Sequence, residues 1–126
     1  MADCAFGIIK NKRDEILLVR IAPPFAESGK WNFPGGVVEE GESNEAGLLR
    51  EINEETNLKC IVLGRKDSFT TQDGRDEINI YSALYVSGDI KIQESEILQA
   101  KWYSTKDALD LVLAFNIRDY ISQSNF

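Results

Sequence analysis

Three carboxylates within residues 50–55 have the spacing of a metal site. Glu51, Glu54 and Glu55 stand at positions i, i+3 and i+4. On an α-helix, which advances about 100° per residue, their side chains point into one arc of about 100°. Like charges at this spacing repel by about 0.2–0.5 kcal/mol per pair, so they gain nothing unless a cation lies on that face. Dense oxygen ligands suit a hard divalent ion, and the spacing therefore predicts a site for Mg²⁺ or Mn²⁺.

The alternative interpretation of these acids is a solvated helix face. Seven acids lie between residues 39 and 55, and Arg50 is the only basic residue in that span. A surface helix that is stabilised by its charges normally interleaves lysine or arginine with the acids. The imbalance favours the metal site.

The stretch from Gly36 to Leu58 resembles the Nudix box, the signature of the Nudix hydrolases. That signature reads G-x5-E-x7-R-E-U-x-E-E-x-G-U, where U is a bulky aliphatic residue. Eight of its nine specified positions match with the spacing intact, and they are Gly36, Glu42, Arg50, Glu51, Ile52, Glu54, Glu55 and Leu58. Residues 31–36, Trp-Asn-Phe-Pro-Gly-Gly, resemble the usual lead-in to the box. The box itself covers about a fifth of the chain.

One position departs from the box, because Asn57 stands where the family has its last glycine. The position follows the expected helix, where chains commonly turn through a left-handed conformation. Asparagine adopts this conformation more readily than any residue except glycine. We expect the turn to be preserved and the activity to be retained.

The resemblance implies roles for the residues of the box. Nudix hydrolases cleave a nucleoside diphosphate linked to a group X, by metal-assisted attack of water on a pyrophosphate phosphorus. By resemblance, Glu51, Glu54 and Glu55 bind Mg²⁺ or Mn²⁺, and the backbone carbonyl of Gly35 completes the coordination. Arg50 is expected to orient the glutamates through ion pairs, which makes Glu51, Glu54 and Arg50 the catalytic candidates. Glu42 is expected to brace the loop or the helix, with a metal role as the alternative.

The general base varies among Nudix hydrolases and does not transfer by resemblance. Glu51 is one candidate. Glu77 and Glu96 are others and are also candidates for substrate contact, since both lie in segments after the box that could reach the metal face. For each of these two the alternative is an ordinary surface carboxylate.

Four residues near the box are candidates for contact with substrate or for packing. Arg20 ends the second expected strand and is either a phosphate contact or a surface arginine. Phe25, Trp31 and Phe33 could form a stacking wall for a base. Core packing fits Trp31 and Phe33 slightly better than stacking does, whereas Phe25 lies in a loop and fits a substrate contact better.

Composition excludes several classes of function. The chain contains no histidine, which rules out His-based acid–base chemistry, His-ligated zinc and Ser-His or Cys-His nucleophiles. A net charge of −7 argues against binding a nucleic-acid polymer but permits a small phosphorylated substrate carried with Mg²⁺. Cys4 and Cys60 lie in apolar, strand-like sequence, so we expect buried free thiols. With no apolar run long enough for a membrane span or a signal peptide, we expect a cytoplasmic protein, as a monomer or homodimer.

The order of elements predicts one α+β domain over residues 1–126. The apolar runs at residues 4–10 and 15–21 are typical of a β-hairpin, and short strands are expected at residues 31–33 and 37–39. A helix should begin after Ser43 and end near Thr56, with Leu48, Leu49 and Ile52 on its apolar side. Strands at 60–69, 78–86 and 100–103, a helix from Ser104 or Thr105 to about Leu113, and a final helix at 116–122 complete the pattern. The resemblance sharpens this to the Nudix α/β/α sandwich, with a mixed sheet between helices.

The leading prediction of function is a MutT-like nucleoside triphosphate pyrophosphohydrolase that releases the monophosphate and pyrophosphate. The alternatives are hydrolysis of ADP-ribose or of a dinucleoside polyphosphate, and a nucleotide-binding sensor without turnover. The intact Arg50, Glu51, Glu54 and Glu55 speak against the sensor. A purely structural scaffold gives no reason for three carboxylates on one arc.

Overall fold

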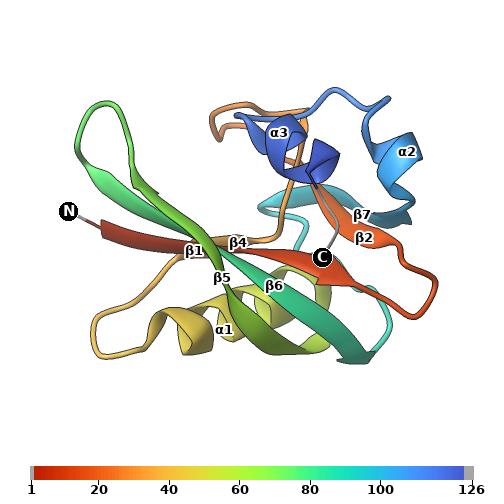
Figure 1. The fold of residues 1–126 in the computed structure, drawn as a ribbon, viewed down its shortest axis with the longest axis horizontal. Helices are drawn as coiled ribbons and strands as arrows, with labels where there is room; N and C mark the ends of the chain where they lie inside the picture. The colour runs from red at the N-terminus through yellow and green to blue at the C-terminus, as the bar shows by residue number, and fades with distance from the viewer. Residues whose placement is uncertain (1, 124–126) are drawn as a thin grey trace.

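A mixed β-sheet forms the centre of the computed structural model, which describes residues 2–123 (Figure 1). The strands are β1 (Ala2–Lys10), β2 (Ile16–Ile21), β3 (Trp31–Asn32), β4 (Gly35–Val37), β5 (Lys59–Thr70), β6 (Asp76–Ser87) and β7 (Ile97–Tyr103). The helices are α1 (Asn44–Thr56), α2 (Thr105–Ala108) and α3 (Ile117–Ser122).

Strand β1 organises the sheet because it pairs with three other strands. It runs parallel to β6 along its whole length and antiparallel to β4 near its start. It meets β2 at the turn end of the predicted hairpin, where Lys10 pairs with Ile16. The sheet order is β3-β2-β1-β6-β5, with β4 beside β1 and β7 beside β2. The predicted α+β class and mixed sheet are confirmed.

Helix α1 covers one face of the sheet. Leu48 and Ile52 are fully buried there against Ala5 and Ile9 of β1, as the apolar side of the helix predicts. Ser43 accepts a hydrogen bond from the N–H of Ala46 at 3.1 Å and so caps the helix N-terminus.

The helix ends in the left-handed turn expected at Asn57. Asn57 has φ 66° and donates its backbone N–H to the carbonyl of Asn53 at 2.8 Å. This geometry closes the last turn as a glycine would. The departure from the box at this position therefore preserves the local structure.

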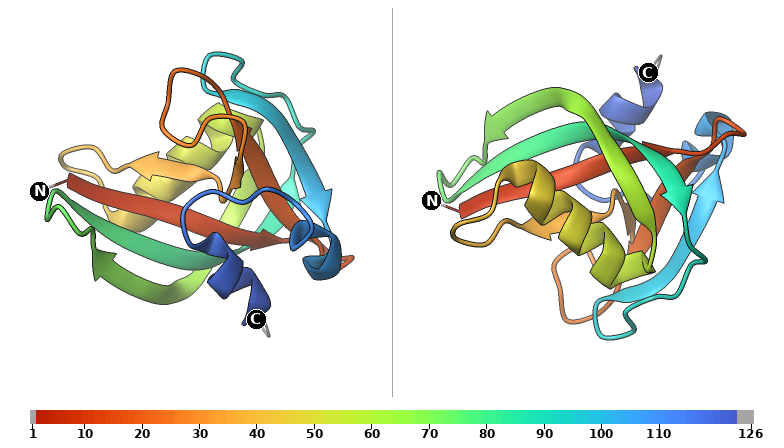
Figure 2. Two further views of the ribbon diagram at one scale, coloured as in Figure 1. Left: turned by 90° about the horizontal axis from the view of Figure 1, so that it is seen from above. Right: turned by 90° about the horizontal axis from the view of Figure 1, so that it is seen from below.

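Helices α2 and α3 cover the opposite face, so the sheet lies between helices as predicted (Figure 2). Ile117 and Ile121 of α3 pack on a second cluster that contains Ile8 and Phe33. Cys4 and Cys60 are buried and form no disulfide, which confirms the expected free thiols. Within residues 2–123, no helix is both long and apolar enough to cross a membrane.

Two predicted boundaries were wrong. The helix expected to reach Leu113 ends at Ala108, because the chain beyond it turns extended and pairs with β3. Trp31 donates its N–H to Val112 at 2.9 Å, and Ala114 donates to the carbonyl of Trp31 at 2.8 Å. The short strand expected at residues 37–39 is β4, which begins and ends two residues earlier.

Candidate functional site

Three carboxylates converge between helix α1 and the segment before strand β7. One oxygen each from Glu51, Glu55 and Glu96 lies within 4.8 Å of the others. Glu51 and Glu55 occupy successive turns of α1, whereas Glu96 precedes β7. Glu55 is only 5% exposed, and the other two are partly buried. The structure therefore brings two of the predicted box residues together with one of the two later glutamates.

Backbone hydrogen bonds hold Glu96 in this position. The loop before it docks on the end of α1, where Lys91 donates to the carbonyl of Thr56 at 3.0 Å and Gln93 donates to that of Glu55 at 3.1 Å. On the other side, Ala22 donates its N–H to the carbonyl of Glu96 at 2.9 Å. Glu96 is thus tied both to the helix that carries its partners and to the loop after β2.

The electrostatics of the cluster favour a bound cation. Burial raises the pKa of Glu55 well above its usual range, and the charges of Glu51 and Glu96 add to the effect. The N–H of Gly35, 3.3 Å from Glu55 Oε1, opposes the rise. Burial also raises the pKa of Glu51, against the lowering effect of Arg50. No ion pair joins Glu55 or Glu96 to a basic side chain within residues 2–123, so either a bound proton or a cation taken up from solution balances their charge.

Two glycines let β4 approach the cluster closely. Gly35 has φ +150°, and a side chain there would overlap the backbone of Ala5 and Phe6 in β1. A Cβ on Gly36 would lie 2.8 Å from the carboxyl carbon of Glu51. Both positions therefore need glycine, and both line the cleft beside the carboxylates.

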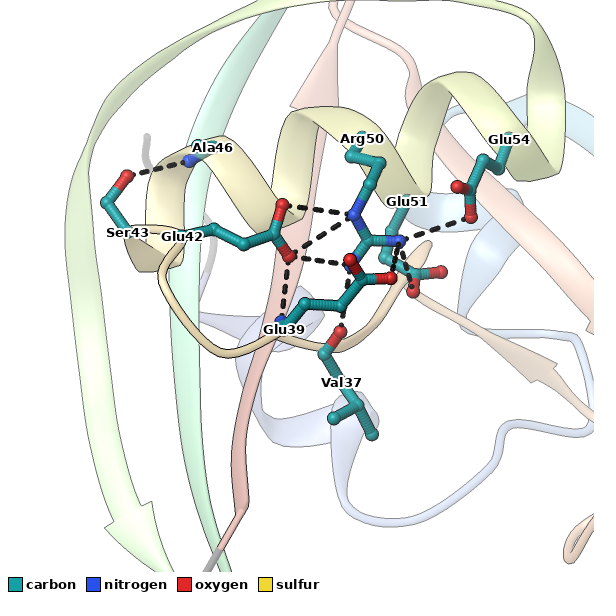
Figure 3. A network of polar contacts seen from close by, with 8 residues as sticks. All are labelled: Val37, Glu39, Glu42, Ser43, Ala46, Arg50, Glu51 and Glu54. Atoms are coloured by element: carbon teal, nitrogen blue, oxygen red, sulfur yellow. Dashed lines mark hydrogen bonds and ion pairs between the residues drawn. The ribbon is translucent and has the colours of Figure 1, made fainter.

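Arg50 is the centre of an ion-pair network next to this cluster (Figure 3). Its Nε and Nη2 bind the carboxylate of Glu42 at 3.0 and 2.8 Å in a fork. Its Nη1 lies 3.2 Å from both Glu51 and Glu54, and its Nη2 donates to the carbonyl of Val37 at 3.1 Å. Arg50 therefore holds Glu51 through an ion pair, as the sequence suggests.

Glu42 braces the loop before α1. It accepts a hydrogen bond from the N–H of Glu39 at 2.8 Å, in addition to the fork from Arg50. The hydrogen bonds from Arg50 lower the pKa of Glu42, the largest effect on this carboxyl. Glu42 is not part of the converging group, so the bracing role fits its surroundings better than the alternative metal role.

Glu54 lies apart from the converging carboxylates. Its side chain is 47% exposed and pairs with Arg50. A helix turns about 100° per residue, and the arc that holds all three box glutamates leaves Glu54 at one edge of it. The role of Glu54 as a metal ligand stays a prediction.

The carboxylates open onto a cleft of about 660 Å³. Phe25 lines this cleft and is 48% exposed, as a loop residue that contacts substrate would be. Phe33 also lines it but is 1% exposed, and its ring packs edge-on against Tyr120, with 6.4 Å between the ring centroids. Trp31 is buried against Tyr103 at 5.3 Å. Trp31 is therefore a core residue. Phe33 packs in the core and also lines the cleft.

Arg20 and Glu77, two of the candidates for substrate contact, do not line this cleft. Arg20 donates from Nε to the carbonyl of Gly29 at 2.8 Å and from Nη1 to Gln99 at 3.2 Å. Glu77 accepts hydrogen bonds from Ser68 at 2.6 Å and Thr70 at 2.8 Å, across the β5–β6 pair. Both side chains are engaged in bracing contacts, and their substrate roles stay predictions.

The cleft residues that the sequence analysis did not name as candidates include Asn32, Asp76 and Phe115. Asp76 neighbours the candidate Glu77, and one residue along a strand reverses the face on which a side chain lies. Asp76 alternates along β6 with Ile78 and Ile80, which line an adjoining cavity together with it, and this alternation is a signal that could have identified it. Phe115 lies between the two helices predicted to end near Leu113 and to begin at residue 116, and it was not named as a candidate for substrate contact.

Residues 2–123 match the family model of the NUDIX domain. The chain belongs to the NUDIX family. The crystal structure of a MutT protein from Methanosarcina mazei Go1 superposes with a TM-score of 0.80 at 25% identity, covering 97% of this chain and 91% of that one. The NUDIX domain of Shewanella oneidensis NrtR, in complex with ADP ribose, superposes with a TM-score of 0.78 at 25% identity and covers 97% and 84%. The α+β arrangement is therefore the Nudix fold.

Curated NUDIX relatives are more similar in sequence but longer. Putative nudix hydrolase 1 of Caenorhabditis elegans is 33% identical over 90% of this chain and 32% of its own length. The NAD-capped RNA hydrolase NudC of Mannheimia succiniciproducens is 37% identical over 79% of this chain and 39% of its own length. A putative 8-oxo-dGTP diphosphatase of Bacillus subtilis is 30% identical over 79% of this chain and 64% of its own length. The chain spans between 32% and 41% of the length of five curated relatives, including those from Caenorhabditis elegans and Mannheimia succiniciproducens.

Proposed function

We propose that this protein hydrolyses a pyrophosphate bond in a nucleoside diphosphate linked to a group X, with a divalent metal ion. The observation that carries the proposal is the convergence of Glu51, Glu55 and Glu96 within 4.8 Å at the wall of an open cleft. Membership of the NUDIX family supports the same reaction class.

The donor set fits Mg²⁺ or Mn²⁺. All three groups are carboxylates, one of them is buried, and no basic side chain within residues 2–123 neutralises Glu55 or Glu96. Hard oxygen donors of this kind suit these ions and not a soft metal. Glu51, Glu55 and Glu96 would hold the ion, with the carbonyl of Gly35 and the carboxylate of Glu54 as further ligands carried over from the resemblance. A divalent ion at this place supplies charge neutralisation for phosphoryl oxygens and lowers the pKa of water.

The contacts around the cluster orient its members. Arg50 fixes Glu51 through the ion pair at 3.2 Å and keeps its carboxylate from turning to solvent. The loop bonds to α1 hold Glu96 opposite Glu51. Glu51 and Glu96 are the candidates for the general base, because each is partly exposed to the cleft and can accept a proton from water.

The substrate that we propose is a nucleoside triphosphate, cleaved to the monophosphate and pyrophosphate as by a MutT protein. The structural similarity to MutT of Methanosarcina mazei Go1 and the sequence similarity to the putative 8-oxo-dGTP diphosphatase of Bacillus subtilis support it. The ADP ribose complex of the Shewanella oneidensis NUDIX domain and the NAD-capped RNA hydrolases support the alternative of an ADP-containing diphosphate. A cytoplasmic location, the absence of a nucleic-acid polymer partner and a monomer or homodimer stay predictions.

A product assay tests the proposal. Ordinary and 8-oxo nucleoside triphosphates, ADP-ribose and diadenosine polyphosphates are offered with Mg²⁺ or Mn²⁺, and the products are resolved by chromatography. We expect a triphosphate to give monophosphate and pyrophosphate, with all turnover abolished by EDTA. Turnover of ADP-ribose alone would favour the alternative substrate. Nucleotide binding without any turnover would contradict the proposal of a hydrolase and support a nucleotide-binding sensor.

A further inference from the structure

A second cavity, of about 310 Å³, adjoins the carboxylate cleft. The two share part of their lining, which makes them one continuous depression. The shared residues are Phe6, Asn32, Phe33, Asp76 and Phe115. The second cavity is walled mainly by aromatic and aliphatic side chains, whereas the carboxylates Glu51, Glu55 and Glu96 line the first. The depression thus has one end suited to a metal-bound phosphate and one end suited to a flat apolar group.

Asp76 is the only charged residue that lines the second cavity, among the residues that the structure describes. Its backbone is fixed at the start of β6, where it pairs with Ala2 and accepts a hydrogen bond from the N–H of Thr71 at 2.9 Å. Its N–H donates to the Thr71 hydroxyl at 3.1 Å. Its carboxylate has neither an ion pair nor a hydrogen bond within residues 2–123. The backbone is held while the two acceptor oxygens stay available to a ligand.

An aromatic side chain lines the same two cavities as this carboxylate. Phe115 lines both cavities although it is 63% exposed, and its φ of 50° is unusual for a residue with a side chain. Such backbone conformations cost free energy and persist where the surrounding structure requires them. An exposed ring at the mouth of an apolar cavity can stack on a planar ligand.

We propose that Asp76 is a specificity-determining residue that accepts two hydrogen bonds from a nucleobase with adjacent N–H donors, as on the N1 and N2 edge of guanine. The proposal rests on the proposed function, because it assumes a nucleotide with its phosphates at the carboxylate end. A carboxylate only accepts hydrogen bonds, so it favours a base edge with two neighbouring donors. Adenine presents one donor beside an acceptor, and uracil presents one donor between two carbonyls. The side-chain amides of Asn32 and Asn116 line the same cavity and offer donors for a carbonyl on the same base.

The test compares guanine with hypoxanthine, which lacks the 2-amino group and keeps the rest of the edge. We measure kcat/KM for GTP and ITP, and the Kd of GMP and IMP, with the wild-type protein and Asp76→Asn. The matched control is Asp3→Asn, which removes an exposed acid from the neighbouring strand at the position that pairs with Glu77. Asp76→Ala is the second variant, and circular dichroism establishes that each variant folds.

We expect the wild type to prefer the guanine ligand over the hypoxanthine ligand by about ten-fold or more, as for one well-placed hydrogen-bonded pair. Asp76→Asn and Asp76→Ala should reduce that ratio to near one, while Asp3→Asn keeps it. An unchanged ratio in both Asp76 variants, or no preference in the wild type, would overturn the role of Asp76. If no triphosphate is cleaved, the proposed triphosphate substrate is wrong, and the Kd values still decide about Asp76: a preference for GMP that the variants lose supports its role. Absence of binding by both monophosphates overturns it.

Discussion

Gln93 donates its backbone N–H to the carbonyl oxygen of Glu55 at 3.1 Å, and this bond joins the two segments that build the site. The acceptor belongs to a residue whose side chain is itself one of the three converging carboxylates. The donor lies three residues before Glu96, the carboxylate that the box does not contain. The geometry of the cluster therefore depends on docking of the 88–96 loop as much as on the helix.

Replacing Glu96 by glutamine should weaken metal binding and turnover together. The amide keeps the size of the side chain but removes one of three charges that face the proposed ion. We expect turnover to fall by about 100-fold or more and the affinity for Mn²⁺ to fall in parallel. Glu94→Gln, on the same loop and exposed, is the matched control and should behave as wild type. Equal effects of the two substitutions would mean that the loop charge and not the converging carboxylate matters.

Glu55→Gln should stabilise the metal-free protein at neutral pH. The pKa of Glu55 is raised in the folded state, so its stabilising contribution is complete below the pKa of the unfolded chain and is lost as the pH rises through the folded pKa. The difference in Tm between Glu55→Gln and wild type in EDTA should therefore grow from pH 5 to pH 8. Thermal unfolding at these pH values measures it. A Tm of the variant below wild type at pH 8 in EDTA would contradict the unfavourable burial of this charge.

Glu54→Gln tests the place of Glu54 in the site. The resemblance to the box implies a metal ligand, and we expect turnover to fall by orders of magnitude while circular dichroism reports an intact fold. The alternative is that Glu54 only forms the exposed ion pair with Arg50 and does not bind the metal. A wild-type rate would remove Glu54 from the metal site and leave the three converging carboxylates as the ligand set.

Arg50→Lys should destabilise the loop before α1, because lysine cannot form the fork to Glu42. We expect a lower Tm and a lower turnover, since Glu51 loses its ion-pair partner as well. A double-mutant cycle with Glu42→Gln should give effects that do not add. Arg50 lowers the pKa of Glu42, so the stability that wild type gains over Glu42→Gln should be present at neutral pH and lost as the pH falls through the lowered pKa. Additive effects on Tm would show that the fork contributes nothing.

The sequence predicts the helix of the site well because its signals are local. The cap at Ser43, the buried stripe of Leu48 and Ile52, and the left-handed turn at Asn57 each depend on a few neighbouring residues. Glu51 and Glu55 follow from their spacing on that helix.

The remainder of the site depends on contacts between segments that are far apart in the chain. The sequence names Glu96 and Glu77 as equal candidates for the general base, and the hydrogen bonds of the loop before Glu96 to α1 bring Glu96, and not Glu77, to the carboxylate cluster. Asp76 and Glu77 are adjacent in sequence, and the register of β6 against β1 decides which one faces the cleft. The helix predicted up to Leu113 failed for a similar reason, since pairing with Trp31 overrides helical propensity beyond Ala108.

The most direct test of the central claim is to locate the metal. A crystal of the protein soaked with Mn²⁺ is measured at the manganese absorption edge, and the anomalous difference map is calculated. We expect a peak coordinated by the carboxylates of Glu51, Glu55 and Glu96. A peak elsewhere, or none at a Mn²⁺ concentration that saturates turnover, would contradict the assignment of this cluster as the metal centre.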